Sequence, residues 1–375
     1  MKAVVVGGGL LGMLTARELS KAGMSVTLLE RGKMGGESSW AGGGILSPLY
    51  PWNYADSVNA LARWSQRQYP QLVAELIDEG GMDPQWIQSG LLMLDSESCQ
   101  KAGPSSLISR ATDWARQYGM ACERLDERAL HEQELELAPG YAQGLLFPEV
   151  AQVRNPRLVK SLQTSCLKRG IQLVAQCAVT DLLVSDAGAS TSHRVTGVKT
   201  EEADYEADVV VVCAGAWSAH LLAHLNIELP IKPMKGQMIL YRTQPGRINR
   251  ITLSDGHYVI PRRDGRILAG STLEDVGFDK STSDDALTEL RQFAEGLFPC
   301  LARAEIEHHW SGLRPESPAG IPYICNVPGV EGLFLNTGHF RNGVVLAPAS
   351  ARLVTDLVLG HEPFLDPADY GCERG

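Results

Sequence analysis

The sequence predicts an α/β fold in which a unit with a parallel sheet is joined to a unit with an antiparallel sheet. Three observations indicate this. An apolar run at residues 3–6 is followed by a glycine-rich turn, a helical pattern and a second apolar run that closes on Glu30. Residues 208–213 are continuously apolar after Asp208, as in strands buried on both faces of a parallel sheet. Residues 231–273 instead alternate and contain two Asp-Gly turns, which is typical of antiparallel hairpins.

The first thirty residues have the spacing of a dinucleotide-binding βαβ unit. Gly7 permits the sharp turn after the first strand, and Gly9 lets the backbone approach a pyrophosphate. Gly12 lets the helix pack closely on the strand. Glu30 can accept hydrogen bonds from an adenosine ribose, and its charge disfavours a phosphate on that ribose. The sequence therefore predicts a Rossmann-like domain that binds an adenine dinucleotide other than NADP.

The rest of the chain supplies elements for both units. Helical periodicity recurs at residues 55–80, 105–138, 156–169, 284–298 and 343–360. Strand patterns lie at residues 86–95, 171–175, 178–184 and, as a hairpin, 194–207. Pro70 predicts a break or kink in the first of these helices. We expect a loop over residues 35–44, which are rich in glycine, and a loosely held tail after His361.

The composition narrows the class of function. The chain has 375 residues, 44% of them hydrophobic and 21% charged, as in an ordinary globular protein. A net charge of -10 gives no support for nucleic-acid binding, and no apolar run has the length of a transmembrane segment. The eight cysteines form no CxxC pair, so we expect a cytoplasmic protein with reduced thiols and no metal site. Peripheral membrane attachment and homo-oligomer formation stay open.

Several separated segments together resemble the D-amino acid oxidase family of FAD-dependent oxidoreductases. They are the glycine-rich start, Gly-Gly-Glu-Ser-Ser at 35–39, the strand end at 209–217, Tyr-Val-Ile-Pro-Arg at 258–262, Ser-Gly-Leu-Arg-Pro at 311–315 and Gly-His-Phe-Arg-Asn-Gly at 338–343. The likeness extends from about residue 2 to residue 360. One departure is Glu37, where relatives often carry arginine, so we expect no charged contact with the flavin phosphates from this position.

The resemblance implies an FAD-binding Rossmann-like domain of the glutathione reductase type, with an interleaved α+β substrate domain built on an antiparallel sheet. The FAD-binding domain would comprise residues 1–88, 150–228 and 318–375, and the substrate domain residues 89–149 and 229–317. The residues implied for cofactor binding are Gly7, Gly9, Leu10, Leu11, Gly12, Glu30, Arg31, Ser38, Ser39, Gly42, Gly43, Gly44, Val179, Ala214, Gly215, Trp217, Gly338, His339, Phe340, Arg341, Asn342 and Gly343.

Non-covalent FAD is implied by the residues near position 314. Relatives with covalent flavin carry a cysteine close to this position, whereas this chain has Arg314 and Pro315. The planar guanidinium of Arg314 is suited to a substrate carboxylate, because it donates two parallel charged hydrogen bonds. The Tyr258 hydroxyl and the charge of Arg341 would assist it. With the carboxylate bound, the substrate's α C–H can pass a hydride to flavin N5, so no catalytic acid or base is expected. His339 would contact the flavin through its backbone.

The resemblance implies oxidative deamination of glycine and other small amines, such as sarcosine and small D-amino acids, in thiamine thiazole biosynthesis. The imine would be hydrolysed to a keto acid, glyoxylate from glycine, while molecular oxygen is reduced to hydrogen peroxide. An alternative is a D-amino acid or glycine dehydrogenase that passes electrons to a quinone or another acceptor, like the flavoprotein subunit of hydrogen cyanide synthase. Another alternative is a flavin-binding regulatory or scaffold protein without turnover. The preferred amine stays open.

Overall fold

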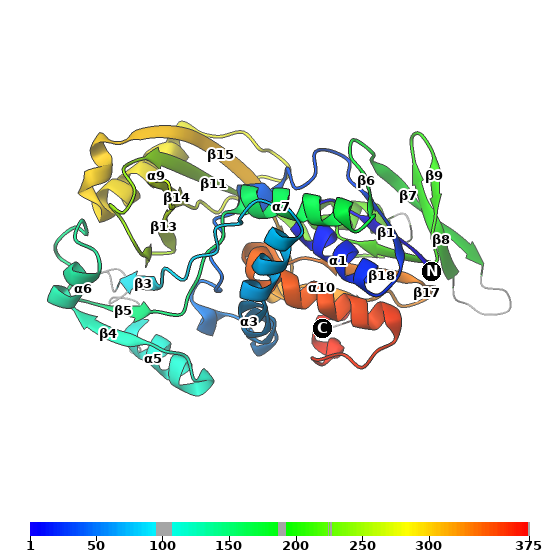
Figure 1. The fold of residues 1–375 in the computed structure, drawn as a ribbon, viewed down its shortest axis with the longest axis horizontal. Helices are drawn as coiled ribbons and strands as arrows, with labels where there is room; N and C mark the ends of the chain where they lie inside the picture. The colour runs from blue at the N-terminus through cyan, green and yellow to red at the C-terminus, as the bar shows by residue number, and fades with distance from the viewer. Residues whose placement is uncertain (95–106, 187–192, 224, 226, 374–375) are drawn as a thin grey trace.

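The computed structural model describes residues 1–94, 107–186, 193–223, 225 and 227–373. Two parts lie side by side along the longest axis of the molecule (Figure 1). One part is built on a six-stranded sheet with a four-stranded sheet beside it, and the other on an eight-stranded sheet. The mixed α/β fold expected from the sequence is confirmed.

The six-stranded sheet has the order β16-β18-β10-β1-β2-β6. All neighbours are parallel except β16 and β18, which are antiparallel. The valine runs of β1 and β10 pair side by side, from Ala3 with Val209 to Val6 with Val212, and are buried on both faces. The strands are β1 (Lys2–Val6), β2 (Ser25–Leu29), β6 (Gln172–Val174), β10 (Val209–Val212), β16 (Tyr323–Asn326) and β18 (Leu333–Thr337).

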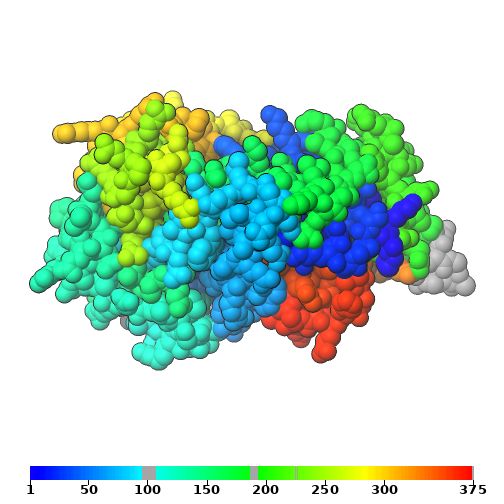
Figure 2. Space-filling view, in the orientation of Figure 1, coloured from blue at the N-terminus to red at the C-terminus, as the bar shows by residue number. Residues whose placement is uncertain are grey.

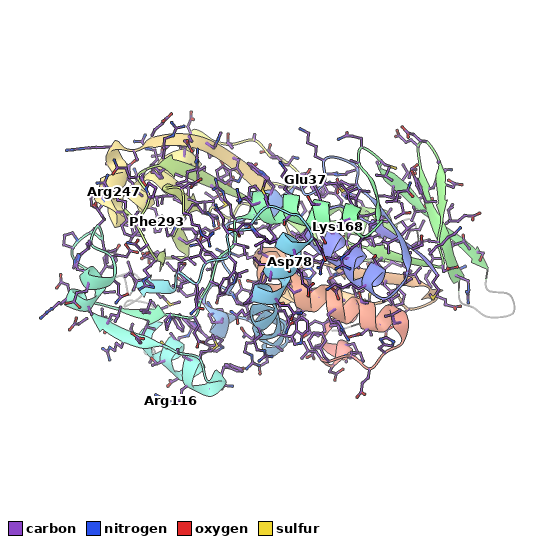
Figure 3. All side chains as sticks on the ribbon, viewed as in Figure 1. Glu37, Asp78, Arg116, Lys168, Arg247 and Phe293 are labelled. Carbon is purple, nitrogen blue, oxygen red and sulfur yellow. The ribbon has the colours of Figure 1, made fainter. Side chains whose placement is uncertain are left out.

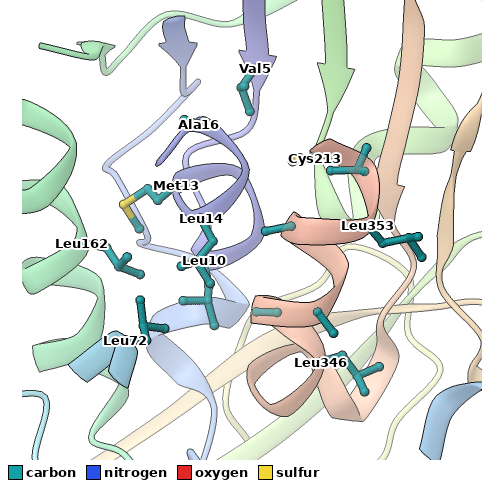
Figure 4. Packing of buried hydrophobic residues seen from close by; sticks show 14 of the residues in the cluster. Val5, Leu10, Met13, Leu14, Ala16, Leu72, Leu162, Cys213, Leu346 and Leu353 are labelled. Atoms are coloured by element: carbon teal, nitrogen blue, oxygen red, sulfur yellow. The ribbon is translucent and has the colours of Figure 1, made fainter. Parts of the chain in front are cut away.

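Four helices cover one face of this sheet: α1 (Leu10–Lys21), α3 (Asp56–Asp78), α7 (Asn155–Lys168) and α10 (Gly343–Leu359). Figure 4 shows α1 beside α10, and Leu10 and Leu14 of the first helix belong to the same apolar cluster as Leu346 of the second. Lys168 of α7 donates to the carbonyl of Asp78, 3.4 Å away, and Figure 3 shows both residues near the middle of the molecule. The helical layer therefore joins segments that are far apart in the chain.

The segment Phe340–Leu359, which contains α10, is long and apolar enough to cross a membrane by length and composition. It is the one such segment in the described part of the chain, and 67% of its most apolar window is buried inside the molecule. That burial is typical of a core helix.

The other face of the six-stranded sheet meets a second apolar cluster and the four-stranded sheet at the right of Figure 1. The strand order there is β17-β8-β7, and β9 also pairs with β8. These strands are β7 (Val179–Asp186), β8 (His193–Thr200), β9 (Asp204–Glu206) and β17 (Val330–Glu331). The hairpin expected over residues 194–207 is confirmed by β8 and β9.

The eight-stranded sheet has the order β15-β11-β14-β13-β12-β3-β5-β4. Only β12 and β3 pair in parallel. The strands are β3 (Leu91–Leu94), β4 (Glu123–Asp126), β5 (Gln143–Phe147), β11 (Lys232–Arg242), β12 (Ile251–Ser254), β13 (His257–Pro261), β14 (Arg266–Gly270) and β15 (Glu305–Glu316). They all fall inside the ranges 89–149 and 229–317, whereas the other two sheets lie outside them. The assignment of these ranges to two domains stays a prediction.

Further helices complete both parts. The α-helices are α2 (Ser38–Ala41), α5 (Leu107–Tyr118), α6 (Glu127–Gln133), α8 (Ser218–Ala223) and α9 (Asp284–Leu297). The 3-10 turns are η1 (Pro51–Asn53), η2 (Gly215–Trp217), η3 (Pro299–Arg303), η4 (Pro318–Gly320), η5 (Phe340–Asn342) and η6 (Pro367–Tyr370).

Several sequence predictions about local structure were wrong. The break expected at Pro70 does not occur, because α3 continues through this residue and both of its halves pack against buried helices. The expected loop at 35–44 contains the single turn α2. The strand β4 interrupts the helices expected over 105–138, part of which lies outside the described residues.

The tail after His361 is not loosely held in the described residues. The ring of Phe364 lies 4.6 Å from the ring of Trp64, centroid to centroid. Tyr370 is 1% exposed, and its hydroxyl donates to the carbonyl of Ser57 over 2.9 Å. Figure 2 shows this red segment against the blue surface of the N-terminal third. Apolar contacts with α3 therefore outweigh the lack of periodicity in the tail.

Candidate functional site

A cavity of about 510 Å³ lies where the parallel strands end and the two parts meet. Residues just beyond β1, β2, β10 and β18 line it, which is the usual location of a ligand in an open parallel sheet. The eight-stranded sheet contributes Tyr258 and Arg314. The cavity therefore contains residues of both parts, and the candidate site is shared between them.

Almost all sequence-predicted site residues line this cavity. The exceptions are Gly12 and Asn342. At Gly12, a Cβ atom would lie 1.8 Å from the carbonyl oxygen of Gly7, so this glycine lets α1 pack on the strand turn. Asn342 is 3% exposed and precedes the first residue of α10. Gly12 and Asn342 therefore lie next to the residues that form the cavity wall, outside the cavity itself.

The turn after β1 requires glycine for steric reasons. Gly7 has a φ of +108°, and a Cβ there would lie 2.4 Å from the carbonyl oxygen of Cys213. At Gly9 a Cβ would meet only the hydroxyl of Ser39, at 3.1 Å. The first helical N–H, that of Leu10, donates to the same hydroxyl at 2.8 Å. The N-terminus of α1 thus faces the cavity, where backbone N–H groups favour an anion.

Glu30 holds the backbone at the end of β2. One carboxylate oxygen accepts from the N–H of Gly8 and the other from the N–H of Gly32, both at 2.7 Å. The side chain is 8% exposed and still lines the cavity. Its oxygens keep further lone pairs that can accept from hydroxyl groups. Sequence analysis did not predict the backbone contacts, because no pattern links residue 30 to residue 8.

Arg31 and Glu37 form a charged rim beside Trp217. The guanidinium carbon of Arg31 lies 3.5 Å from the centroid of the Trp217 ring. Glu37 pairs with Arg31 at 3.2 Å and with Lys280 at 3.1 Å. Figure 3 shows Glu37 where the two parts meet. Glu37 therefore binds cations of both parts, in the position where arginine was expected from the resemblance.

The loop of Gly42, Gly43 and Gly44 is packed too tightly for side chains. A Cβ at Gly44 would lie 2.1 Å from the carbonyl oxygen of Val153, and φ there is +78°. The side-chain amide of Asn155 donates to the carbonyl of Ser39 at 3.0 Å. Asn155 was missed as a supporting residue, although its place before Pro156 at the start of a predicted helix was a signal.

Arg314 lies within β15. Its guanidinium donates to the hydroxyl of Ser271 at 2.7 Å, and to the carbonyls of Thr272 and Lys235 at 3.2 and 3.3 Å. A Cβ at Gly236 on β11 would lie 2.1 Å from the guanidinium nitrogens, so this glycine makes room for it. The Gly236 contact was missed, because it connects two neighbouring strands.

Arg314 is a half-buried cation. Burial lowers the pKa of its guanidinium, the nearby Tyr258 acts in the opposite sense, and the charge of Arg341 lowers the pKa again. The described residues place no carboxylate within ion-pair distance of it. A half-buried guanidinium without a carboxylate partner can therefore bind an anion in the cavity.

Tyr258 and Arg341 face the same space from two elements. Tyr258 lies on β13 and is 7% exposed. Arg341 lies in η5, and its guanidinium donates to the carbonyl of Gly256 at 3.4 Å. His339 lines the cavity, but its Nε2 lies 2.9 Å from the hydroxyl of Ser350 on α10. The ring of His339 is therefore held by α10.

Further lining residues were not predicted. Asn336, near the end of β18, is fully buried. Its side-chain amide donates to the hydroxyl of Thr15 at 2.9 Å, while its side-chain oxygen has no partner among the described residues. Its place at the end of a strand was the available signal. The other missed lining residues include Cys177, Ala178, Thr180, His220 and Leu221.

The lining chemistry fits FAD. The N–H groups at the start of α1 suit phosphates, the Glu30 carboxylate suits ribose hydroxyls, and the flat walls made by glycines suit a planar ring. The start of α10 also lies at the cavity, where its dipole favours negative charge. Within the described ranges, no group of three or more His, Cys, Asp or Glu could hold a metal ion.

Comparisons with known proteins show what the whole chain is similar to. The family model described as "FAD dependent oxidoreductase" (DAO) matches residues 2–357. The chain is 48% identical over 370 residues to "Glycine oxidase" of Pseudomonas aeruginosa, covering 98% of each chain. It is 30% identical to "Bifunctional protein ThiO/ThiG" of Trichormus variabilis, covering 98% of this chain and 54% of that protein. The crystal structure of glycine oxidase from Geobacillus kaustophilus superposes with a TM-score of 0.92 at 30% identity, covering 100% and 98% of the chains.

Proposed function

Because the chain belongs to the DAO family of FAD-dependent oxidoreductases, we propose that it oxidises glycine and other small amines with molecular oxygen. It is a flavoenzyme, and FAD is its cofactor. Glycine would give an imine that is hydrolysed to glyoxylate, with hydrogen peroxide as the second product, and the reaction would serve thiamine thiazole synthesis. The observation that carries the proposal is the half-buried guanidinium of Arg314, which lines the same cavity as the glycine-rich turn.

We assign the cofactor to the half of the cavity formed by the six-stranded sheet. The first turn of α1 would bind the pyrophosphate, and Glu30 the ribose. The loop of Gly42–Gly44 and the segment 338–343 would contact the flavin, which accepts a hydride from a substrate carbon when bound. No cysteine lies at residues 311–315 of β15, which supports non-covalent attachment.

The substrate would bind in the half formed by the eight-stranded sheet. Arg314 would take the carboxylate with two parallel hydrogen bonds, and Tyr258 would donate a third from its hydroxyl. Arg341 adds positive charge near the same position. These three contacts would fix the carboxylate, so that only one face of the α carbon is presented to the cofactor.

The charges of the lining residues also favour small neutral side chains. The acidic lining residues are Glu30 and Glu37, and both belong to the cofactor half. In the described residues, no carboxylate lines the cavity beside Tyr258 and Arg314. A substrate with a cationic side chain would therefore lack a counterion and would be desolvated at a cost.

The test uses purified protein loaded with FAD. Addition of glycine without oxygen should bleach the yellow flavin, and addition of oxygen should restore the colour with release of peroxide. Bleaching without peroxide would identify a dehydrogenase that uses another acceptor. Failure to bleach with glycine, sarcosine or D-alanine would reject the proposal and favour a binding protein. The same panel of amines would establish the preferred substrate.

Location and assembly stay predictions. A cytoplasmic enzyme is supported by Cys166, Cys177 and Cys213, which are buried free thiols, as expected in a reducing compartment. Sedimentation of the purified holoenzyme would establish whether the chain forms a homo-oligomer.

A further inference from the structure

Arg262 is a buried arginine, and it lies behind the cavity wall. It follows β13 directly and is 7% exposed. One terminal nitrogen donates to the carbonyl of Gly43 at 2.7 Å. The other donates to the carbonyl of Val153 at 3.0 Å and to the side-chain oxygen of Gln152 at 2.8 Å. The arginine belongs to the eight-stranded sheet, whereas all three acceptors belong to the other part of the molecule.

The charge of Arg262 has no carboxylate partner in the described part of the chain. Burial lowers the pKa of its guanidinium to about 10. The nearby positive charge of Arg154 adds to this, and the more distant charge of Asp264 opposes it without forming an ion pair with Arg262. Neighbouring arginines differ: Arg263 pairs with Asp83 at 2.7 Å, and Arg266 pairs with Asp264 at 3.0 Å. A buried cation that contacts only neutral acceptors destabilises a fold compared with an apolar residue, so its presence needs a reason.

The position of Gly43 supplies this reason. Gly43 lines the cavity, and a Cβ there would lie 2.9 Å from the Ile260 side chain and 3.3 Å from the Tyr258 hydroxyl. The backbone of the loop is therefore pressed against β13, with Arg262 bound to its carbonyl. Tyr258 lies four residues before Arg262 and faces the cavity from the same strand.

We propose that Arg262 is a positioning residue that joins the cofactor-lining loop at Gly43 to the strand that carries Tyr258. Its three hydrogen bonds fix the distance between the flavin-binding wall and the substrate-binding wall. Its unpaired charge adds a positive field to the cavity, which stabilises negative charge on the reduced cofactor. The proposal rests on the proposed function, because it assigns the two walls to flavin and amine.

The test compares Arg262→Gln and Arg262→Lys with the matched control Arg263→Gln, whose residue is exposed and adjacent. The FAD-loaded proteins are examined by potentiometric titration and by glycine kinetics. Arg262→Gln should shift the flavin potential to more negative values and raise KM at least about tenfold, since it loses charged hydrogen bonds. Arg262→Lys should have the wild-type flavin potential, because the charge is kept. Its KM should still be raised, because an ammonium lacks the planar fork. Arg263→Gln should change neither.

The proposal is overturned if Arg262→Gln matches Arg263→Gln in potential and has a KM within about twofold of it. Should Arg262→Gln fail to fold, Arg262→Lys decides: wild-type KM in that variant would equally overturn the positioning role. The potential needs only bound FAD and no amine. A wild-type protein that glycine does not reduce would therefore reject the proposed function, while the titration would still test the contribution of Arg262 to the flavin potential.

Discussion

The guanidinium of Arg31 stacks on the ring of Trp217 at 3.5 Å, and both residues line the cavity. The ring of Phe278 lies 5.3 Å from Trp217, which places a residue of the eight-stranded part beside this stack. The stack joins the end of β2 to the turn η2 after β10. It closes one side of the site that we assign to the cofactor.

Loss of this stack should weaken FAD binding. Cation–π contacts of this exposure stabilise by about 0.5 to 1 kcal/mol, so Trp217→Ala should raise the Kd of FAD at least about twofold. Titration of the apoprotein with FAD, followed by flavin fluorescence, measures the change. Trp217→Phe keeps an aromatic face and is the control. A Kd for Trp217→Ala equal to that of Trp217→Phe would show that the stack has no part in retention.

Removal of the Glu30 carboxylate should have a larger effect. Glu30→Ala loses the acceptors for the N–H groups of Gly8 and Gly32 as well as the expected ribose contact. Charged hydrogen bonds contribute about 1.5 to 3 kcal/mol each, so the Kd of FAD should rise at least about tenfold. Equilibrium dialysis against FAD measures this, with exposed Glu201→Gln as the control. Equal retention by Glu30→Ala and the control would exclude the ribose contact.

Arg314→Ala should raise KM for glycine at least about tenfold, because the charged hydrogen bonds to the carboxylate are lost. The absorption spectrum of bound FAD should be unchanged, since Arg314 lies in the substrate half of the cavity. Arg314→Lys keeps the charge but not the fork and should be intermediate. The exposed Arg303→Ala is the control, and steady-state kinetics is the measurement. Wild-type KM in Arg314→Ala would remove this residue from the proposed substrate site.

Glu134 should make stability depend on pH. Burial raises the pKa of its carboxyl from 4.5 to about 7, against the opposing effect of the N–H groups of Asn249 and Arg250. The folded chain therefore holds a proton that the unfolded chain releases between these pH values. The contribution of Glu134 to the free energy of unfolding is therefore fully present below pH 4.5. It is lost as the pH rises through 7, by about 3 kcal/mol in total.

The variant Glu134→Gln should lose this part of the pH dependence. Urea unfolding at pH 5 and pH 8 compares the two proteins, with Glu136→Gln as the control, because Glu136 is partly exposed and pairs with Arg247 at the surface. A pH difference in stability that is the same in Glu134→Gln as in the wild type would show that Glu134 titrates normally.

The C-terminal tail should contribute measurably to stability. Tyr370→Phe removes the hydrogen bond to Ser57 and should cost about 1 kcal/mol. Tyr370→Ala also leaves a cavity in the apolar cluster and should cost about 3 to 5 kcal/mol. Denaturant unfolding measures both values. A loosely held tail would instead give two variants as stable as the wild type.

Local patterns predicted much of the fold. The valine runs of β1 and β10 and the Asp-Gly turn at Gly256 depend on neighbouring residues, and the structure has them where they were expected. The strand β15 was not predicted, although Arg314 lies on it. Many of its residues are polar and half-buried, so it lacks an apolar run, and its pairing with β11 is the contact that defines it.

The sequence predicted less of the candidate site where the site depends on contacts between distant segments. Spacing indicated that Gly7 and Gly9 face a ligand, because the turn is local. No spacing links Arg262 to Gly43, because this pair meets only after the two parts have packed together. No spacing links Gly236 to Arg314 either, because this pair depends on the pairing of β11 with β15. At Pro70 the local rule predicts the end of a helix, but tertiary packing maintains the helix.

The late position of β18 in the chain has a consequence for biogenesis. This strand pairs with β10, and the residues that follow it, up to Val344, complete the cavity wall. A nascent polypeptide that ends before Leu333 lacks that wall, however well its first thirty residues have folded. We therefore expect the proposed cofactor site to be complete only after residues up to Val344 have been synthesised and folded, so that earlier intermediates expose apolar surface.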